Sequence, residues 1–358
     1  MTFSLEEIKS IPKTDLHVHL DGSVRIESLI EFATALKVKL PSYNKEGLRE
    51  LVFKDQYKDL PEYLKCFDYL CAALQDLENI EKASYEFALD AFLDGVYHVE
   101  ARYCPNLVLN EKKNYSIKDV ILAVEKGLSH AARLINEQIK GSPKTQKIFS
   151  DYPFTDKAFT YTQILCIMRH WPAEASLEYI KELIAIKNSA DIDIKNIDLA
   201  GPENGFPVSM HKAAFAEAAI FNKTIHAGEA DGPESIAAAI EIANAKRIGH
   251  GVNLFDKSYN YGEDKTKSLI QTMKDKDISI EVCLTSNLQT LPHLEMKAEN
   301  HNLIKMIEAG IKIVPATDNR TVSNTTVSEE IFKIQSAFGL DKDTVLALIK
   351  NGFSAKFN

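Results

Sequence analysis

Four short motifs along the chain end apolar runs with side chains that can bind or assist a metal ion. They are Asp15-Leu16-His17-Val18-His19, Thr224-Ile225-His226-Ala227-Gly228-Glu229, Arg247-Ile248-Gly249-His250-Gly251 and Ala316-Thr317-Asp318-Asn319. Imidazole nitrogens and carboxylate oxygens are ligands that Zn²⁺ prefers, and a catalytic site combines a few such ligands with water. The motifs therefore predict a catalytic zinc site.

The candidate ligands come from three of these motifs. His17 and His19 are two residues apart, so on a strand both imidazoles point to the same face. The pair alone is a weak signal, but His226 and Asp318 would complete a site of three histidines and one carboxylate. We therefore expect one Zn²⁺ per chain, bound by His17, His19, His226 and Asp318.

Glu229 and His250 are the candidate proton-handling groups. Glu229 follows His226 by three residues, where burial would raise its pKa and suit it to donate a proton; an exposed loop glutamate is the alternative. His250 lies between two glycines, which allow the backbone to approach closely. Beside a metal-bound water, His250 would orient that water and take or shuttle its proton.

Missing motifs exclude several other classes of site. The run ending Asp198-Leu199-Ala200-Gly201 lacks the lysine that bridges two metals in binuclear barrel hydrolases, which favours one metal. The sequence also lacks the Pro-Cys-x-x-Cys motif of the small zinc deaminases. It contains neither a Gly-x-x-x-x-Gly-Lys phosphate loop nor a Gly-x-Ser-x-Gly elbow.

Eight β-rich runs alternate with helical patterns and must position these groups. The runs are 13–20, 96–104, 162–169, 194–200, 222–227, 245–250, 278–284 and 311–317. Eight such units in 358 residues predict a (β/α)₈ TIM barrel, in which catalytic groups lie at the carboxyl ends of the strands. A doubly wound sheet is the alternative, but it would not gather the ends of the first and last strands at one point.

No repeat or linker divides the sequence, so we expect a single domain over 1–358. The segment 22–95 is long enough for several extra helices between strands 1 and 2, and we expect it to cover the pocket. Within it, one set of residues has the spacing of a single helix face, and periodicity alone favours an ordinary core face: Leu60, Tyr63, Leu64 and Phe67. The polar segment 141–161, with interspersed aromatics, is expected to be an ordered surface excursion.

The composition of the chain limits the classes of molecule that it can have as its main partner. The net charge of −9 argues against nucleic acid or an anionic membrane as the main partner, since both would repel an acidic surface. No apolar stretch approaches a membrane span, and the first residues resemble neither a signal peptide nor a transit peptide. Five cysteines without a Cys-x-x-Cys pair suit reduced thiols. We therefore expect a cytoplasmic monomer that acts on a small molecule.

Nine segments of the sequence resemble motifs of the adenosine deaminase family and occur in the same order as in that family. They are IPKTDLHVHLDGSVR (11–25), LPEYLKCFDYL (60–70), VEARYCP (99–105), MRH (168–170), DLAGPE (198–203), HAGE (226–229), RIGHGVNL (247–254), EVCLTSNLQT (281–290) and TDN (317–319). The first segment and His-Ala-Gly-Glu together are specific to the adenosine, adenine and AMP deaminase group.

The resemblance implies a zinc-dependent barrel that converts adenosine, and 2′-deoxyadenosine, to inosine-type products and ammonia in purine salvage. It implies the same four metal ligands, with Glu229 protonating purine N1 and with His250 and Asp318 positioning the attacking water. The implied substrate contacts are His19 beside the substrate, the Gly201 N–H at N3, Asn319 at N7, Asp21 at a ribose hydroxyl, and an apolar gate formed by Leu60, Tyr63, Leu64 and Phe67.

One departure and three alternatives follow from the resemblance. Many members have Asp-Asp where this chain has Asp318-Asn319, and a neutral asparagine amide can donate to N7 directly. Adenine deaminase is the nearest alternative, but those relatives tend to have Glu where this chain has Asp21. AMP deaminase is disfavoured because the long N-terminal region and a phosphate clamp are missing. The full ligand set and Glu229 argue against a catalytically weak adenosine-binding signalling protein.

Overall fold

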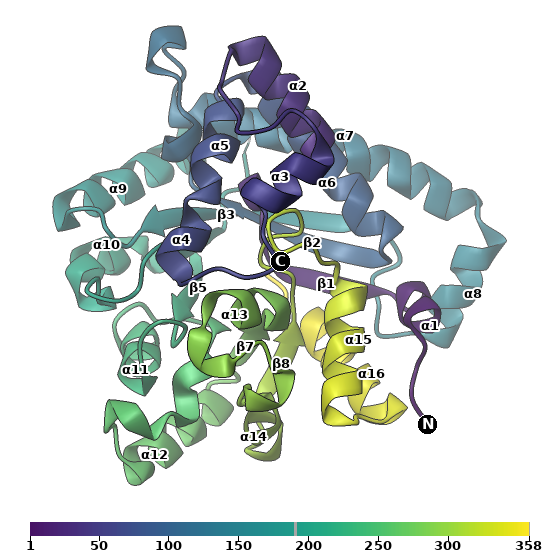
Figure 1. Ribbon diagram of the computed structural model, residues 1–358, viewed down its shortest axis with the longest axis vertical. Helices are drawn as coiled ribbons and strands as arrows, with labels where there is room; N and C mark the ends of the chain where they lie inside the picture. Colours follow the sequence, from purple (N-terminus) through teal and green to yellow (C-terminus); the bar gives the residue numbers. More distant parts are fainter. Residues whose placement is uncertain (190–191, 358) are drawn as a thin grey trace.

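The computed structural model describes residues 1–189 and 192–357. Eight parallel strands, ordered β1 to β8, form a barrel that the helices surround (Figure 1). The strands are β1 Lys13–His19, β2 Val96–Tyr103, β3 Thr160–Met168, β4 Asn196–Ala200, β5 Asn222–Ala227, β6 Arg247–His250, β7 Ser279–Val282 and β8 Lys312–Pro315. The prediction of a (β/α)₈ barrel is confirmed, with each observed strand lying within two residues of its predicted limits or inside them.

The helices alternate with the strands, and several extra ones lie between β1 and β2. They are α1 Leu5–Ser10, α2 Ile26–Leu36, α3 Lys45–Leu51, α4 Leu60–Leu64, α5 Cys66–Ala73, α6 Leu77–Leu93, α7 Ile117–Gly141, α8 Pro143–Asp151, α9 Ala173–Ser189, α10 Lys212–Glu217, α11 Pro233–Glu241, α12 Glu263–Asp275, α13 Leu284–Thr290, α14 Leu303–Glu308, α15 Val327–Phe338 and α16 Lys342–Ala355. In the described part of the chain, none is long and apolar enough to cross a membrane.

The strands are buried because helices cover the outside of the barrel while side chains fill its inside. Every residue of β2, β4, β6 and β7 is buried. Parallel strands covered in this way have nearly continuous apolar sequences. Their charged members, such as Glu100 and Arg102 of β2, are therefore unusual and must have partners inside the barrel.

The barrel closes between β8 and β1 at the carboxyl ends of these two strands. Val18 and Asp318 form a parallel bridge, in which the N–H of His19 donates to the Asp318 carbonyl at 2.7 Å. The Asp318 N–H donates in turn to the His17 carbonyl at 2.8 Å. Helix α16 packs against both strands from outside. Three of the four predicted metal ligands thus lie along this closing seam.

Helices α2 to α6 occupy the predicted helical segment between β1 and β2. The predicted face over residues 60–67 is divided between α4 and α5, but Lys65 between them keeps helical angles of φ −63° and ψ −21°. The face is therefore continuous. The segment 141–161 is ordered, with α8 in its first half and Phe149 packed edge-on against Tyr97.

Candidate active site and metal centre

A cavity of about 440 Å³ opens at the carboxyl ends of the strands. This is the size of a small-molecule site and the usual place for one in this fold. It is lined by His19, Asp21, Gly201, His226, Glu229, His250, Asp318 and Asn319, and by Leu60, Tyr63, Leu64 and Phe67. The structure thus brings these sequence-predicted residues together, while His17 lies completely buried beneath them.

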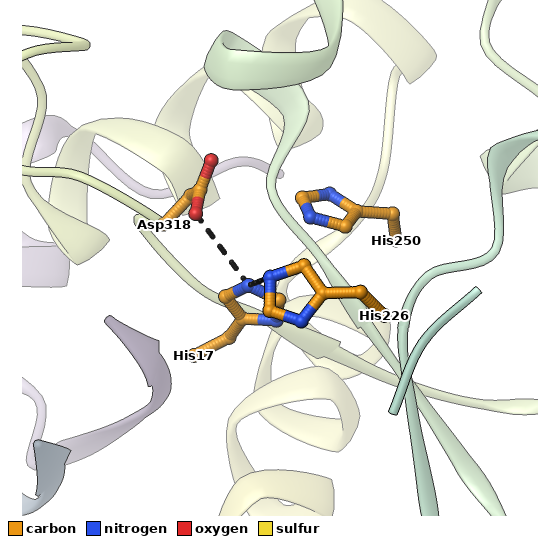
Figure 2. Close-up of side chains that lie close together, drawn as sticks. All are labelled: His17, His226, His250 and Asp318. Carbon is orange, nitrogen blue, oxygen red and sulfur yellow. Dashed lines mark hydrogen bonds and ion pairs between the residues drawn. The ribbon is translucent and has the colours of Figure 1, made fainter. Parts of the chain in front are cut away.

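The four predicted ligand atoms lie at distances that suit one metal ion. His226 Nε2 is 3.1 Å from His17 Nε2 and 3.3 Å from His19 Nε2. Asp318 Oδ1 is 3.5 Å from His17 Nε2 and 3.4 Å from His19 Nε2. Ligands 2.0–2.2 Å from a tetrahedral ion lie about 3.3–3.6 Å apart. Figure 2 shows the Asp318 carboxylate directed at the ring of His17, which contacts the ring of His226. The donor set fits zinc.

His250 is close enough to be considered as an alternative ligand. His17, His226, His250 and Asp318 offer ligand atoms that all lie within 4.8 Å of one another. His19 Nε2 is 3.3 Å from His226 Nε2 and 3.4 Å from Asp318 Oδ1, and these distances match the edges of a zinc tetrahedron. These distances agree with the expectation that His19 is a ligand and that His250 lies beside the ligand set.

Buried carboxylates orient two of the ligand histidines from behind. His17 Nδ1 is 2.8 Å from Glu281 Oε2, and His226 Nδ1 is 2.9 Å from Asp198 Oδ2, the latter at an angle too bent for a good hydrogen bond. A carboxylate behind the ring keeps the proton on Nδ1 and leaves the Nε2 lone pair for a metal. Arg102 joins the two carboxylates, donating to Asp198 at 3.0 Å and to Glu281 at 2.9 Å.

A second charged layer lies deeper in the barrel. Arg247 donates to Glu281 through Nε at 2.5 Å and pairs through its other nitrogens with Glu100. None of these side chains is more than 1% exposed. Sequence reasoning gave no role to Asp198, Glu281, Arg102 or Arg247, although each lies in a segment that resembles the family. The sequence signal that could have identified these four residues is the presence of a charged residue inside an otherwise apolar strand.

Glu229 has the surroundings of a proton donor. It is 5% exposed and lines the cavity, with its Oε2 atom 3.7 Å from His250 Nε2. Burial raises the pKa of Glu229 well above its ordinary value, and the negative charges of Asp318 and Glu203 raise this pKa further. This burial rules out the alternative of an exposed loop glutamate, and the raised pKa favours the acid form that can donate a proton.

Two site residues have a left-handed backbone conformation: His250 at φ 67° and Asp318 at φ 61°. Such a conformation costs a non-glycine residue about 1–3 kcal/mol and is often found at functional sites. Close packing explains the glycine before His250, because a Cβ on Gly249 would come 2.8 Å from His17 Cε1. Ser286 Oγ donates to Asp318 Oδ2 at 2.6 Å and fixes that carboxylate.

The expected gate is less apolar than the resemblance implies. Leu60 and Tyr63 are buried, and Leu64 and Phe67 are half-buried, so these residues both join the core and line the cavity. The Tyr63 hydroxyl accepts from Asn319 Nδ2 at 2.8 Å and bonds to a serine hydroxyl at 2.7 Å. Tyr63 is thus tied to the residue expected to bind the base.

The remaining predicted contacts also face the cavity. Asp21 accepts from the Gly22 N–H at 3.0 Å, and burial raises the pKa of Asp21 to about 6. Gly201, at φ 94°, has an N–H that takes part in no hydrogen bond among the described residues. Both groups are available to a ligand.

Comparison with known proteins agrees with this geometry, since the adenosine deaminase family model matches residues 12–358. The chain belongs to the adenosine deaminase family. An adenosine deaminase of Clostridium acetobutylicum is 30% identical over 356 residues, covering 98% of this chain and 95% of that protein. That of Clostridium perfringens is 33% identical over 351 residues, covering 97% and 94%. The family assignment identifies the chain as a hydrolase of the hydrolytic deaminase group.

Solved structures of the same fold include several related hydrolases. A Burkholderia ambifaria amidohydrolase with bound Zn has a TM-score of 0.79 at 21% identity, covering all of this chain and 90% of the other. An adenine deaminase from Arthrobacter aurescens has a TM-score of 0.77 at 21% identity, covering 97% and 94%. The Arabidopsis N6-mAMP deaminase has a TM-score of 0.76 at 24% identity, covering 99% and 95%. These likenesses establish the fold. The buried group of His17, His226, His250 and Asp318 agrees with a metal-dependent enzyme of this family.

Proposed function

We propose that this protein hydrolyses adenosine, and 2′-deoxyadenosine, to the corresponding inosine and ammonia with one bound Zn²⁺. The observation that carries the proposal is the cluster of four donor atoms, in which His17 Nε2 and His19 Nε2 each lie 3.1–3.5 Å from both His226 Nε2 and Asp318 Oδ1. A buried glutamate lies beside them. Three histidines, one carboxylate and a protonated carboxyl are the groups needed to add water to a protonated purine ring.

The lining of the cavity favours a nucleoside over a nucleotide. Among the described residues that line it there is no lysine or arginine, while Asp21 and Asp68 are present. A phosphate would meet these carboxylates without an arginine fork or a lysine to pair with it. The two Clostridium relatives described above, which are 30% and 33% identical, are named adenosine deaminases, and this supports the same substrate class.

The roles of the residues follow from the chemistry at purine C6. Glu229 gives a proton to N1, which removes electron density from C6. His250 and Asp318 orient the attacking water, whose oxygen adds to C6. Bound Zn²⁺ supplies the acidity that lets such a water act as hydroxide near neutral pH. The adduct then loses its amino group, which takes one proton of the water and leaves as ammonia. The other proton of the water restores the Glu229 carboxyl, and the C6 carbonyl forms.

The other groups hold the nucleoside in register. The Gly201 N–H donates to N3, the Asn319 amide donates to N7, and Asp21 accepts from a ribose hydroxyl. Leu60, Leu64 and Phe67 cover the ring and exclude bulk water from the reacting carbon. His19 contributes its ring edge beside the reacting centre as well as its Nε2 atom to the metal.

A comparison of four substrates tests the proposal. The zinc-loaded protein is mixed with adenosine, 2′-deoxyadenosine, adenine and AMP, and the loss of the adenine chromophore is followed by absorbance. We expect the two nucleosides to be deaminated with a far higher kcat/KM than adenine or AMP. Preference for adenine would show that Asp21 does not select for ribose, and preference for AMP would reveal a phosphate site elsewhere.

A further inference from the structure

The ring of His250 is supported differently from the rings of the ligand histidines. Carboxylates stand behind His17 and His226: Glu281 is within hydrogen-bond distance of His17 Nδ1, and Asp198 lies 2.9 Å from His226 Nδ1. Behind His250 stands the side-chain amide of Asn287, with Nδ2 at 2.9 Å from His250 Nδ1. An amide nitrogen is a donor only, so His250 Nδ1 must be the acceptor. A neutral imidazole with an accepting Nδ1 carries its proton on Nε2.

The direction of this hydrogen bond is fixed by a backbone group. The N–H of Leu303 donates to His301 Nδ1 at 3.1 Å, and His301 Nε2 lies 3.4 Å from Asn287 Oδ1. Burial lowers the pKa of His301 to about 4, so its ring is neutral and has one donor and one acceptor. A backbone N–H can only donate. His301 Nδ1 therefore accepts, His301 Nε2 donates, and the Asn287 oxygen must face His301.

The reverse orientation of the amide is excluded by the same contacts. If Asn287 were flipped, its NH₂ group would face His301 Nε2 while the Leu303 N–H faced His301 Nδ1. A neutral ring cannot accept at both nitrogens. Asn287 is fully buried and His301 is 3% exposed, so solvent offers no alternative partners.

From this chain of donors we propose that Asn287 and His301 are positioning residues that hold His250 with its proton on Nε2. His250 then donates a hydrogen bond to the attacking oxygen instead of taking its proton. This role rests on the proposed function, which puts the attacking oxygen beside His250. It also explains the choice between the two candidate ligand sets, because a protonated Nε2 has no lone pair for a metal.

The position of the two residues separates their role from substrate binding. Neither Asn287 nor His301 is among the described residues that line the cavity. Substitutions there leave the lining side chains in place. We therefore expect kcat to fall while KM and zinc content stay close to those of the wild type.

The decisive variant is Asn287→Asp, because a carboxylate accepts where the amide donated and draws the proton of His250 to Nδ1. The ¹⁵N signals of the His250 ring in the zinc-loaded protein report which nitrogen is protonated. We expect Nε2–H in the wild type, Nδ1–H in the variant, and a fall in kcat of about 10²-fold. A wrong imidazole tautomer costs a serine protease about 10⁴-fold.

Variants at His301 test the same chain from its far end. His301→Gln can still accept from a backbone N–H and donate to Asn287, whereas His301→Leu can do neither. We expect the Gln variant to keep most of the activity, and the Leu variant to lose about tenfold in kcat with a mixture of His250 tautomers. His293→Leu, at an exposed histidine nearby, is the matched control and should match the wild type.

The inference would be overturned by Nδ1–H on His250 in the wild type, or by an unchanged tautomer and kcat in both Asn287→Asp and His301→Leu. A kcat that falls without a change of tautomer would also overturn it, since the effect would then be structural. Because the wild-type tautomer is read without any substrate, a protein that binds zinc but does not deaminate adenosine would refute the proposed function and leave this measurement interpretable.

Discussion

Glu203 holds the loop that carries Glu229. Four successive backbone N–H groups, those of residues 228–231, donate to its carboxylate at 2.7–3.1 Å, and Ser235 Oγ adds a fifth hydrogen bond. The four backbone groups can only donate, so both carboxylate oxygens of Glu203 act as acceptors. Glu203 is 2% exposed and therefore shapes the loop without competition from solvent.

Replacing Glu203 with Gln should disorder this loop and slow the reaction. The amide oxygen can still accept, but the NH₂ group would face backbone donors and leave them unpaired, at about 1–3 kcal/mol. We expect kcat to fall by about 10- to 100-fold, with zinc retained because no metal ligand is touched. Elemental analysis and steady-state kinetics measure both, and Glu234→Gln at the exposed start of α11 is the control. Unchanged kinetics would mean that the loop keeps its conformation without the hydrogen bonds to Glu203.

Replacing Glu229 with Gln should nearly abolish turnover, since an amide cannot give N1 a proton. The zinc content should remain one per chain. Loss of the metal in this variant would show that Glu229 is a ligand or a structural support.

The pH dependence of kcat should report the same carboxyl. Burial first, and then the charges of Asp318 and Glu203, raise the pKa of Glu229 above its ordinary value. Its acid form persists well above the pH at which an exposed glutamate ionises, and activity should fall as pH rises through this raised pKa. In Glu203→Gln one raising charge is gone, so the alkaline limb should move to lower pH. If the alkaline fall of kcat stays at the same pH in this variant, it must reflect the ionisation of a group other than Glu229.

Base recognition by Asn319 can be tested with 7-deazaadenosine, which has carbon in place of N7. If the amide donates to N7, the analogue leaves a buried donor unpaired and should lose about 1–3 kcal/mol, or roughly 5- to 150-fold in kcat/KM. Tyr63→Phe removes the hydroxyl that orients the amide and should shrink this difference. Tyr57→Phe is the control, because the hydroxyl that it removes bonds to the Val52 carbonyl. Equal rates with both nucleosides in the wild type would withdraw the assignment.

Asn319→Asp gives a second test of the same contact. Only a protonated aspartic acid can donate to N7, so activity should persist at low pH and decline as the new carboxyl ionises. A pH profile identical to that of the wild type would contradict a donor role for residue 319.

Truncating Leu64 or Phe67 to Ala should raise KM and slow the reaction, because water would reach the covered cavity. Zinc content should be unchanged. If the variants only lower the melting temperature and the folded fraction keeps normal kinetics, the two side chains serve the core alone.

Removal of the metal should destabilise the protein. The ligand atoms are brought together only by folding, so zinc binds the native state preferentially and stabilises it by mass action, about 2.7 kcal/mol at 100 times Kd. Chelation should therefore lower Tm and abolish activity, and stoichiometric zinc should restore both. Two metals per chain, or full activity without metal, would contradict the assigned site.

Local signals in the sequence were enough for the strands, their order and the polar residues at their ends. The period of two places His17 and His19 on one face, and the positions of His226 and Asp318 at strand ends follow from the fold class. The supporting residues were not predictable in this way. Glu281 is 264 residues from His17, and their contact depends on how the barrel is closed.

The hydrogen bonds made by the gate residues could not be predicted from local sequence patterns either. The spacing of Tyr63 indicates a helix face but cannot show that its hydroxyl meets Asn319, which is 256 residues away. The same holds for Asn287, whose role depends on which of its two amide atoms faces His250. Direction of hydrogen bonding is a property of the assembled network.

The seam between β1 and β8 has a consequence for biosynthesis. His17 and His19 leave the ribosome almost a whole chain length before Asp318, with which they share the closing contact. Under the proposed function, a nascent chain that lacks Asp318 therefore has only a partial set of donors for the metal. The full set of proposed donors is assembled only when the last strand joins the first, so incompletely synthesised copies lack the proposed metal site.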